Sequence, residues 1–256
     1  MLQTFAGGRL FGSRTGQGTP TVLALHGWGR SHRDFDATLR PAGGSGGEPL
    51  DALALDLPGF GASPAPPEVW GPGEYAHCVA GVVEELDAPL VVVGHSFGGR
   101  VAVHLAAARP EQVRAVVVTG APLLRVGAAR RPPPAYRLVR ALHRAGLLSD
   151  ERLESARERY GSADFRAARG IMRQVLSRAV SETDEAQLDA VACPVTLVWG
   201  DDDATVPLAV AEAALARLRA GAAGDACELV VSPGAGHLLP LTAPGVLRQA
   251  IERHLA

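Results

Sequence analysis

The stretch "GHSFGG" places Ser96 between Gly94 and Gly98, after the apolar run "LVVV" and before the helix-compatible "RVAVHLAAA". A serine on a sharp strand-to-helix turn needs glycine two residues before and after it, because larger side chains would collide where the backbone folds back. Such a turn exposes the hydroxyl at the positive end of the following helix. Ser96 is therefore a candidate nucleophile. The alternative is a tight turn with a capping serine.

A serine hydroxyl is a poor nucleophile unless a base takes its proton and a third group holds that base in the right tautomer. Eight histidines are present, and His237 stands in a loop, "SPGAGHLLP", after the last predicted strand. From there its side chain can reach across the end of a sheet. His95 directly precedes the serine, so its ring should point away, and we interpret it as a packed core histidine. His26 opens "HGWG" after a strand. Surface or packing roles are favoured for the remaining histidines, which fall on or beside predicted helices: His32, His77, His104, His143 and His254.

The acid that holds the histidine should come from a strand end between the serine and the histidine. The stretch "VWGDDDATVP" is such a strand end and offers Asp201, Asp202 and Asp203. Taken alone, three adjacent carboxylates also fit a solvated loop. With the serine and the histidine placed, however, the loop completes the chain order serine, acid, histidine.

The chain resembles the α/β-hydrolase superfamily, specifically its serine-nucleophile members with a helical cap. The resemblance covers nearly the whole chain and rests on "LHGWG", "LDLPGFGAS", "VVGHSFGGRVA", "VTLVWGDDDATVP" and "GAGHLLP", in that order. It implies that the acid lies three residues beyond Gly200 and is followed, after two residues, by an aliphatic residue and a proline. That position is Asp203, with Asp202 as the alternative if the loop is bent differently.

Acyl transfer also requires two hydrogen-bond donors for the oxyanion of the tetrahedral intermediate. One should be the backbone N–H of Phe97, directly after the nucleophile. The other, implied by the resemblance, is the backbone N–H of the residue after "HG", which is Trp28. Because these donors belong to the main chain, we expect both side chains to line the acyl pocket. Trp28 also fits an ordinary packing tryptophan.

The elements that must position these residues follow from the apolar pattern. Short apolar runs bounded by Gly or Pro predict buried parallel strands, and they begin at Thr21, Asp51, Leu90, Ala115, Pro194 and Cys227. Helix-compatible stretches lie at 31–39, 74–86, 98–108, 208–218 and 246–255. This alternation predicts a doubly wound, mostly parallel α/β sheet, with "LQTFAGGRLFG" as an antiparallel hairpin at its edge. We interpret residues 56–63 as a structural turn beside the mouth of the site.

One interval, residues 122–192, has no strand-like run and predicts a helical cap inserted between two strands. Residues 1–121 and 193–256 then form the core domain. Met172 in the cap is a candidate substrate contact. It could instead pack helix against core, as could Tyr160 and Phe165.

The cap is rich in positive charge. Between Arg125 and Arg178 it has thirteen arginines against five acidic residues. This charge could draw anionic substrates toward a cleft. The alternative is solvated helix faces in a chain whose cationic side chains are all arginine.

Composition argues against several other classes. A net charge of -2 gives no basic field for nucleic acid, and without lysine the chain has no Walker-type phosphate loop. The three cysteines lie far apart and show no metal-ligand spacing, so we expect neither a metal nor an organic cofactor. The N-terminus has no signal-peptide pattern and no apolar run reaches membrane-spanning length. These features predict a soluble cytoplasmic protein without a membrane partner.

We therefore predict a serine hydrolase that cleaves a carboxylic ester of a small-molecule acyl substrate through an acyl-enzyme intermediate. Serine at position 96 argues against haloalkane dehalogenase and epoxide hydrolase chemistry, which the resemblance links to a carboxylate nucleophile. A thioesterase, acyltransferase, C–C hydrolase or lyase could use the same three residues. A ligand-binding protein on this scaffold is the alternative from another class.

Overall fold

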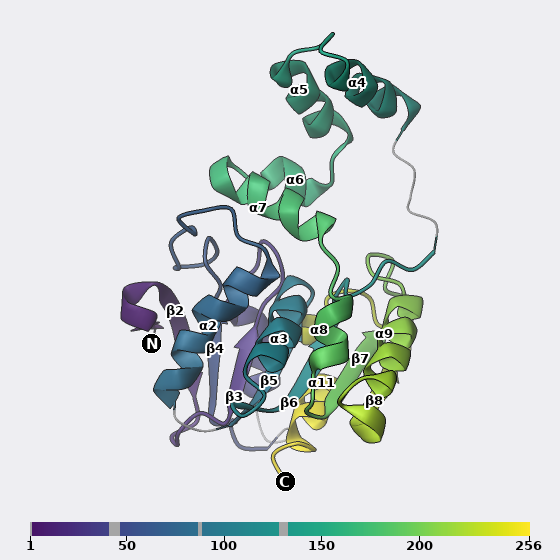
Figure 1. Cartoon of the computed structure of the whole chain (residues 1–256). Helices are drawn as coiled ribbons and strands as arrows, with labels where there is room; N and C mark the ends of the chain where they lie inside the picture. The colour runs from purple at the N-terminus through teal and green to yellow at the C-terminus, as the bar shows by residue number, and fades with distance from the viewer. Residues whose placement is uncertain (1, 41–46, 87–88, 128–132) are drawn as a thin grey trace.

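The computed structural model describes residues 2–40, 47–86, 89–127 and 133–256. Within these residues, an eight-stranded sheet has the order β1-β2-β4-β3-β5-β6-β7-β8 (Figure 1). β2 is antiparallel to β1 and to β4, and the other neighbouring strands are parallel. The strands are β1 (Leu2–Phe5), β2 (Leu10–Thr15), β3 (Val22–Leu25), β4 (Ala52–Asp56), β5 (Leu90–His95), β6 (Val113–Thr119), β7 (Val195–Gly200) and β8 (Cys227–Ser232). The mostly parallel sheet with an antiparallel edge hairpin is thus confirmed.

Helices follow most of the strands. They are α1 (Asp36–Leu39), α2 (Pro72–Leu86), α3 (Phe97–Ala108), α4 (Pro134–Arg144), α5 (Asp150–Tyr160), α6 (Ala163–Ala167), α7 (Gly170–Ser181), α8 (Glu185–Ala190), α9 (Leu208–Ala220), α10 (Leu239–Thr242) and α11 (Pro244–Glu252), with 3-10 turns η1 (Ala6–Gly8), η2 (His32–Phe35) and η3 (Gly224–Ala226). The helix expected over 31–39 is instead the 3-10 turn η2 followed by the single turn α1. The His32 main-chain N–H donates to the Asp56 carboxylate at 2.8 Å and therefore takes no part in a regular helical hydrogen-bond pattern.

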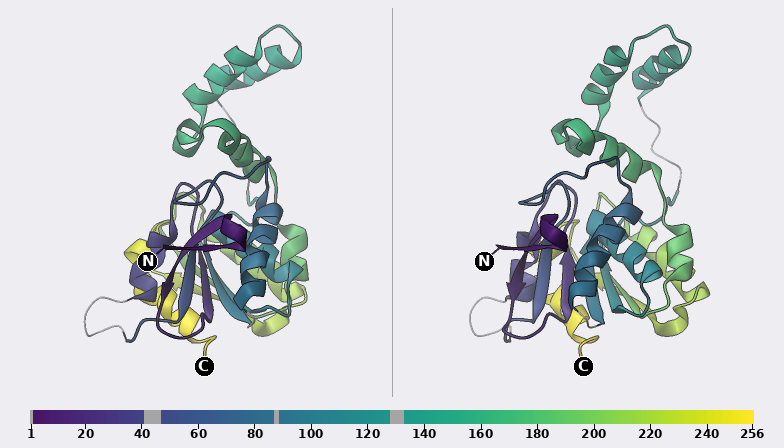
Figure 2. Two further views of the ribbon diagram at one scale, coloured as in Figure 1. Left: turned by 90° about the vertical axis from the view of Figure 1, so that its left-hand side faces the viewer. Right: turned by 60° about the vertical axis from the view of Figure 1, so that its left-hand side comes forward.

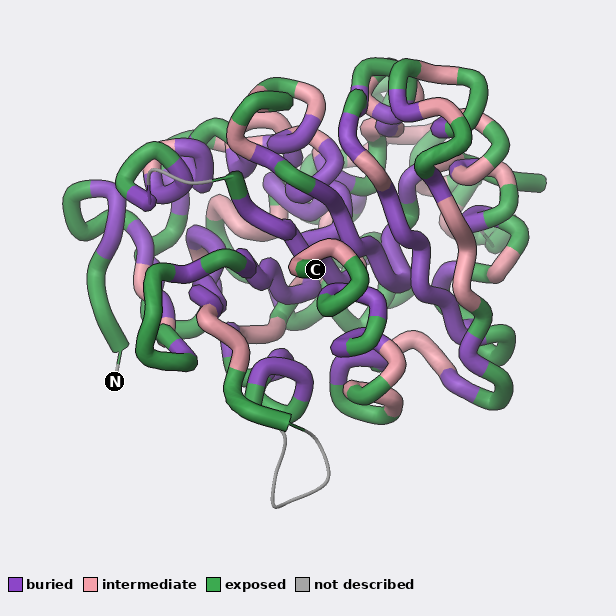
Figure 3. Tube along the Cα trace, turned by 90° about the horizontal axis from the view of Figure 1, so that it is seen from below, coloured by how far each residue is buried: buried purple, intermediate pink, exposed green. Residues whose placement is uncertain are grey.

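Two helical layers enclose the sheet. Helices α2, α3, α8 and α9 lie on one face, and α1 and α11 lie on the other (Figures 1 and 2). Every residue of β3, β4 and β5 is buried, which explains their unbroken apolar runs (Figure 3). β8 was expected to be equally buried, but Val231 is 40% exposed because this strand has a neighbour on one side only.

Helices α4 to α8 lie between β6 and β7 in the sequence. Parallel strands end at one edge of a sheet, and the views show α6 and α7 beyond that edge, with the α4–α5 hairpin further out (Figures 1 and 2). None of the residues of α4 is buried, and Leu138 on it is 60% exposed. α8, by contrast, packs against α3 and α9 in the core layer. The division of the chain at residues 122 and 192 stays a prediction.

A buried ion pair links α3 to the segment that leads from α7 into α8. Arg100 Nε and Nη2 donate to Asp184 Oδ2 and Oδ1 at 2.6 and 2.8 Å, and His104 Nε2 donates to Oδ1 at 2.9 Å. Burial raises the pKa of Asp184, but the hydrogen bonds from His104 and Arg100 outweigh it and lower the pKa below its ordinary value. The helix that follows Ser96 is therefore tied to the residue that precedes α8 by a charged, buried contact.

Candidate active site

Ser96 occupies a strained turn between β5 and α3. Its φ of 52° and ψ of -113° lie in a region that residues other than glycine rarely adopt, and such strain concentrates at functional sites. A Cβ at Gly94 would overlap the main chain of Gly98, and a Cβ at Gly98 would overlap the main-chain oxygen of Leu25. The Ser96 side chain makes no capping hydrogen bond to α3. The turn therefore leaves the hydroxyl available for chemistry.

Asp203 and His237 are in direct contact. His237 Nδ1 lies 2.8 Å from Asp203 Oδ2, and because a carboxylate accepts, Nδ1 carries the proton and Nε2 is left as an acceptor. Asp203 Oδ1 accepts from the N–H groups of Thr205 and Val206, each at 2.8 Å. Burial raises the pKa of Asp203, but the bonds from His237, Val206 and Thr205 outweigh it and hold the pKa below its ordinary value. The carboxylate is thus held ionised against the imidazole.

Within the described residues, the two neighbouring aspartates form no hydrogen bond with the imidazole and instead bond with the loop before His237. Asp201 Oδ1 accepts from the Gly234 N–H at 2.6 Å, and the Asp202 N–H donates to the Ala235 oxygen at 3.1 Å. Both side chains are exposed, whereas Asp203 is 5% exposed. The geometry therefore brings Asp203, and not Asp202, to the histidine, while the other two brace the loop that carries His237.

Ser96 and His237 border the same point at the end of β6. The Ser96 N–H donates to the Thr119 oxygen at 2.8 Å, and the next residue, Gly120, is so close to the His237 ring that a Cβ there would lie 3.1 Å from it. Within the described residues, His237 bonds with Asp203 and His95, and the Ser96 hydroxyl makes no hydrogen bond. Catalytic hydrogen bonds often tighten only when substrate binds. The Ser96–His237 link stays a prediction.

The two expected oxyanion donors are free for a ligand. In the described part of the chain, neither the Trp28 N–H nor the Phe97 N–H donates to a protein acceptor. Their rings meet edge to face with centroids 5.5 Å apart, and Phe60 lies 4.9 Å from Trp28 on its other side. Trp28 is partly exposed, while Phe97 is 5% exposed. Trp28 therefore packs in an aromatic cluster and keeps part of its surface open to solvent, and its place in an acyl pocket stays a prediction.

Met172 reaches the core, and the other two cap candidates do not share its position. A Cβ at Gly59 would collide with the Met172 side chain, so α7 rests on the turn after β4. Tyr160 and Phe165 line a cavity of about 1020 Å³ formed by residues of α4 to α7, whose lining does not include Met172. Of these three residues, Met172 is the one in contact with the turn that we predicted to flank the site.

The turn at residues 56–63 is built by hydrogen bonds. Asp56 is buried, its Oδ1 accepts from His32 Nδ1 at 2.8 Å, and its Oδ2 accepts from the Ala62 N–H at 2.9 Å. His26 accepts from the Leu57 N–H at Nε2, at 3.0 Å, and its Nδ1 donates to the Gly27 oxygen at 2.7 Å. These contacts tie the turn to the "HGWG" loop, so the turn has a structural role.

His95 was interpreted as a packed core histidine, and it is indeed 1% exposed. No sequence pattern indicated that its ring would lie 5.0 Å from the ring of His237. Its Nε2 lies 2.9 Å from the His237 main-chain oxygen, across 142 residues of sequence. Its position beside Ser96 at the end of a strand was the one available signal.

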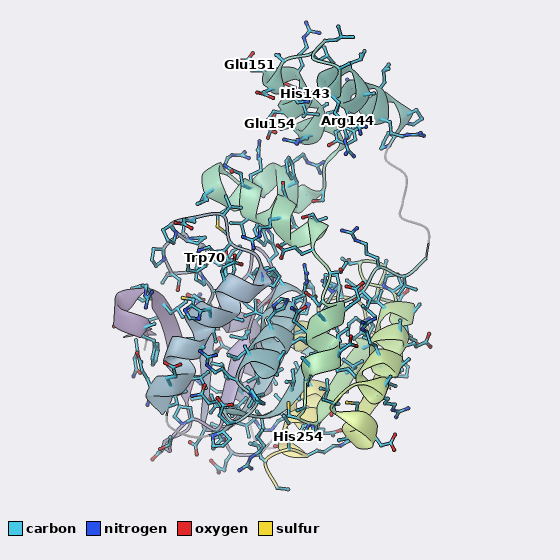
Figure 4. The ribbon with its side chains drawn as sticks, viewed as in Figure 1. Trp70, His143, Arg144, Glu151, Glu154 and His254 are labelled. Atoms are coloured by element: carbon cyan, nitrogen blue, oxygen red, sulfur yellow. The ribbon has the colours of Figure 1, made fainter. Side chains whose placement is uncertain are left out.

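Two of the remaining histidines lie at opposite ends of the molecule. Figure 4 shows His143 on the outer hairpin with Arg144, Glu151 and Glu154, and His254 at the end of the core farthest from the hairpin. His143 Nε2 bonds with Asp150 at 2.7 Å, and His254 Nε2 bonds with Thr196 Oγ1 at 2.9 Å. Both rings therefore have local structural partners.

In the described ranges, no group of three or more His, Cys, Asp or Glu side chains could hold a metal ion. All three cysteines, Cys78, Cys193 and Cys227, are buried and free, and burial raises the pKa of Cys193 to about 11. Across the same ranges, no helix is both long and apolar enough to span a membrane.

The fold and the site together define an α/β-hydrolase. Residues 22–250 match the model of the Alpha/beta hydrolase family, and the chain belongs to this family.

Two curated enzymes are similar over most of the chain. A pimeloyl-[acyl-carrier protein] methyl ester esterase from Neisseria meningitidis serogroup B is 30% identical over 84% of this chain and 85% of its own length. A 2-hydroxy-6-oxononadienedioate/2-hydroxy-6-oxononatrienedioate hydrolase from Cupriavidus pinatubonensis is 28% identical over 79% of this chain and 77% of its own. Among solved structures, a bacterial membrane phospholipase A shares the fold with a TM-score of 0.70 and 24% identity, covering 100% of this chain and 84% of that one.

Proposed function

We propose that the protein is a serine hydrolase that cleaves carboxylic esters through an acyl-enzyme. Ser96 attacks the acyl carbon, His237 takes its proton, and Asp203 orients the imidazole and stabilises its charged form. The Trp28 and Phe97 N–H groups hold the oxyanion, and water then hydrolyses the acyl-enzyme. The observation that carries this proposal is the 2.8 Å bond between Asp203 and His237 beside the strained serine turn.

The protonation states of His237 and Asp203 fit this order of events. The Asp203 bond leaves His237 Nε2 as an acceptor, which is the form a general base requires. The lowered pKa of Asp203 keeps a negative charge beside the ring, where it stabilises the imidazolium that forms when the serine loses its proton. No step requires a metal or an organic cofactor.

The cap supports a substrate that carries a negative charge away from the ester. Of its described arginines, those that pair with carboxylates are Arg157, Arg173 and Arg178. Arg137 and Arg140 instead line the cavity with Tyr136, and neither forms an ion pair within the described residues. One similar enzyme is named for an ester on an acyl carrier protein and the other for a dioate. An acyl group with a distal carboxylate or an anionic carrier fits both names.

A C–C hydrolase with the same catalytic residues is the second candidate. The similarity to the Cupriavidus pinatubonensis enzyme favours this candidate. The name of that enzyme describes a hydrolase of a hydroxy-oxo-dioate, whose chain is carboxylated at both ends. Thioester cleavage, acyl transfer or lyase chemistry would need the same serine and histidine. The helical cap, with Met172 as a substrate contact, and the cytoplasmic location stay predictions alongside these.

The test is a turnover screen with purified protein. p-Nitrophenyl esters of increasing chain length, with and without a terminal carboxylate, are compared with acyl-CoA thioesters and a hydroxy-oxo-dienoate. We expect ester turnover that Ser96→Ala abolishes while circular dichroism of the variant stays native. Faster turnover of the thioesters or of the dienoate would assign the alternative chemistry. Turnover of none of them, with the fold intact, would favour the ligand-binding alternative.

A further inference from the structure

His95 stands one residue before the nucleophile, yet its ring bonds with the main chain of the base. Its Nε2 lies 2.9 Å from the His237 main-chain oxygen, and because a carbonyl oxygen only accepts, Nε2 carries the proton. The ring is 1% exposed, so water does not compete for the bond. A single buried donor therefore joins the end of β5 to the loop between β8 and α10.

The bond from Nε2 to a carbonyl oxygen fixes the tautomer of His95 and leaves Nδ1 as an acceptor. Nδ1 is buried and has no hydrogen-bond partner among the described residues. A Cβ at Gly27 would lie 2.8 Å from Nδ1, so the "HGWG" loop packs closely against this side of the ring. Leaving a buried acceptor unpaired costs free energy, and such a group calls for an explanation. Burial lowers the pKa of His95 to about 4, so the ring is neutral near pH 7.

The loop that His95 contacts needs such an anchor. His237 follows "SPGAG" and lies between main-chain bonds on both sides, from Asp202 N to Ala235 O at 3.1 Å and from Leu241 N to Leu238 O at 2.9 Å. Within the described residues, however, the N–H and oxygen of His237 itself form no main-chain hydrogen bond. Asp203 binds the ring at Nδ1 but forms no hydrogen bond with the peptide of His237. The bond from His95 fixes that peptide, so the residue is held at both ends.

We propose that His95 is a positioning residue that fixes the His237 main chain through its Nε2–H, so that the imidazole faces Ser96. This inference rests on the proposed function for its effect on turnover, but the contact itself has an independent readout. The role differs from catalysis, because His95 reaches the reacting atoms only through His237.

The experiment compares two substitutions at position 95. His95→Gln keeps an N–H donor at a similar reach, whereas His95→Leu keeps much of the volume and removes the donor. A displacement of the base by about 1 Å costs on the order of 100-fold in rate. We therefore expect kcat per folded protein to fall up to about 100-fold in His95→Leu with KM changed less than about twofold, and to recover within about threefold of wild type in His95→Gln.

Nuclear magnetic resonance of the histidine-labelled protein supplies the second readout. The proton on His237 Nδ1, hydrogen-bonded to Asp203, should give an exchange-protected signal in the wild type and in His95→Gln. It should broaden or vanish in His95→Leu. His254→Leu removes a ring bond to Thr196 at the far end of the core, and as the matched control it should change neither readout.

Four outcomes decide the matter. A folded His95→Leu protein with wild-type kcat and an unchanged His237 signal overturns the inference, as does a folded His95→Gln protein that loses the signal. If His95→Leu does not fold, the His95→Gln result alone still decides. If no variant or wild type turns over ester while the His237 signal still depends on residue 95, the proposed function fails and the positioning contact stands.

Discussion

A substitution at Gly120 tests whether the His237 ring packs against this glycine, and a matched glycine elsewhere accounts for the backbone strain. Its φ is 59°, and a Cβ there would lie 3.1 Å from both Cε1 and Nδ1 of His237. An ordinary contact begins at 3.4 Å, so in Gly120→Ala the ring must move by at least about 0.3 Å. If a 1 Å misplacement costs about 100-fold, this shift lowers kcat roughly four- to tenfold.

The same substitution also carries a backbone cost. An L-residue in the left-handed region costs about 1–2 kcal/mol, which lowers the melting temperature of a chain this size by about 2–8 °C. Gly224→Ala is the matched control, because Gly224 has a φ of 56° and nothing within 4 Å of its Cβ position.

Steady-state kinetics and thermal unfolding of both variants give the assay. We expect similar losses of melting temperature, with a loss of kcat in Gly120→Ala alone. Equal kcat values in the two variants would refute the argument that the His237 ring sits against Gly120 in the working enzyme.

Two further predictions concern stability. Asp184→Asn should lower the free energy of unfolding in urea by about 3–5 kcal/mol, because it leaves Arg100 buried without its counter-charge. The control Glu228→Gln breaks an exposed ion pair and should lower it by less than about 1 kcal/mol. Equal losses in the two variants would contradict the stabilising role of the buried pair. Folding lowers the pKa values of Asp184 and Asp203, so the stability they contribute is present above the unfolded carboxyl pKa of about 3.9 and is lost as pH falls through the folded values. The free energy of unfolding should therefore decrease below about pH 4. The decrease should be less steep in Asp184→Asn, which lacks one of the two carboxylates.

Local chemistry made much of the fold and site predictable. The strands of the sheet interior read directly as apolar runs because helices cover both of their faces. The turn at Ser96 was predictable because its glycines are required by neighbours close in sequence or by the adjoining strand. The choice of Asp203 among three adjacent aspartates came from the resemblance to the α/β-hydrolase superfamily, because the loop alone left Asp201 and Asp202 as alternatives.

Contacts between distant segments were not predictable. The bond from His95 to His237 joins two segments 142 residues apart, and nothing in either stretch encodes the other. The cap candidates Met172 and Phe165 share an apolar helical pattern, yet one touches the turn after β4 and the other lines the outer cavity. Which face of a short helix meets the core depends on how the connecting segments turn, and the helical period does not specify that.

The rate at which a fluorophosphonate probe labels Ser96, mapped by peptide sequencing, tests the central claim most directly. The wild type and Asp202→Asn should be labelled at similar rates, because Asp202 is exposed and the His237 ring bonds with Asp203 instead. Asp203→Asn should be labelled on the order of 10⁴-fold more slowly, because the histidine loses the group that fixes its tautomer. An unlabelled Ser96 in the wild type, or an Asp203→Asn protein labelled as fast as the wild type while Asp202→Asn is slow, would contradict the account.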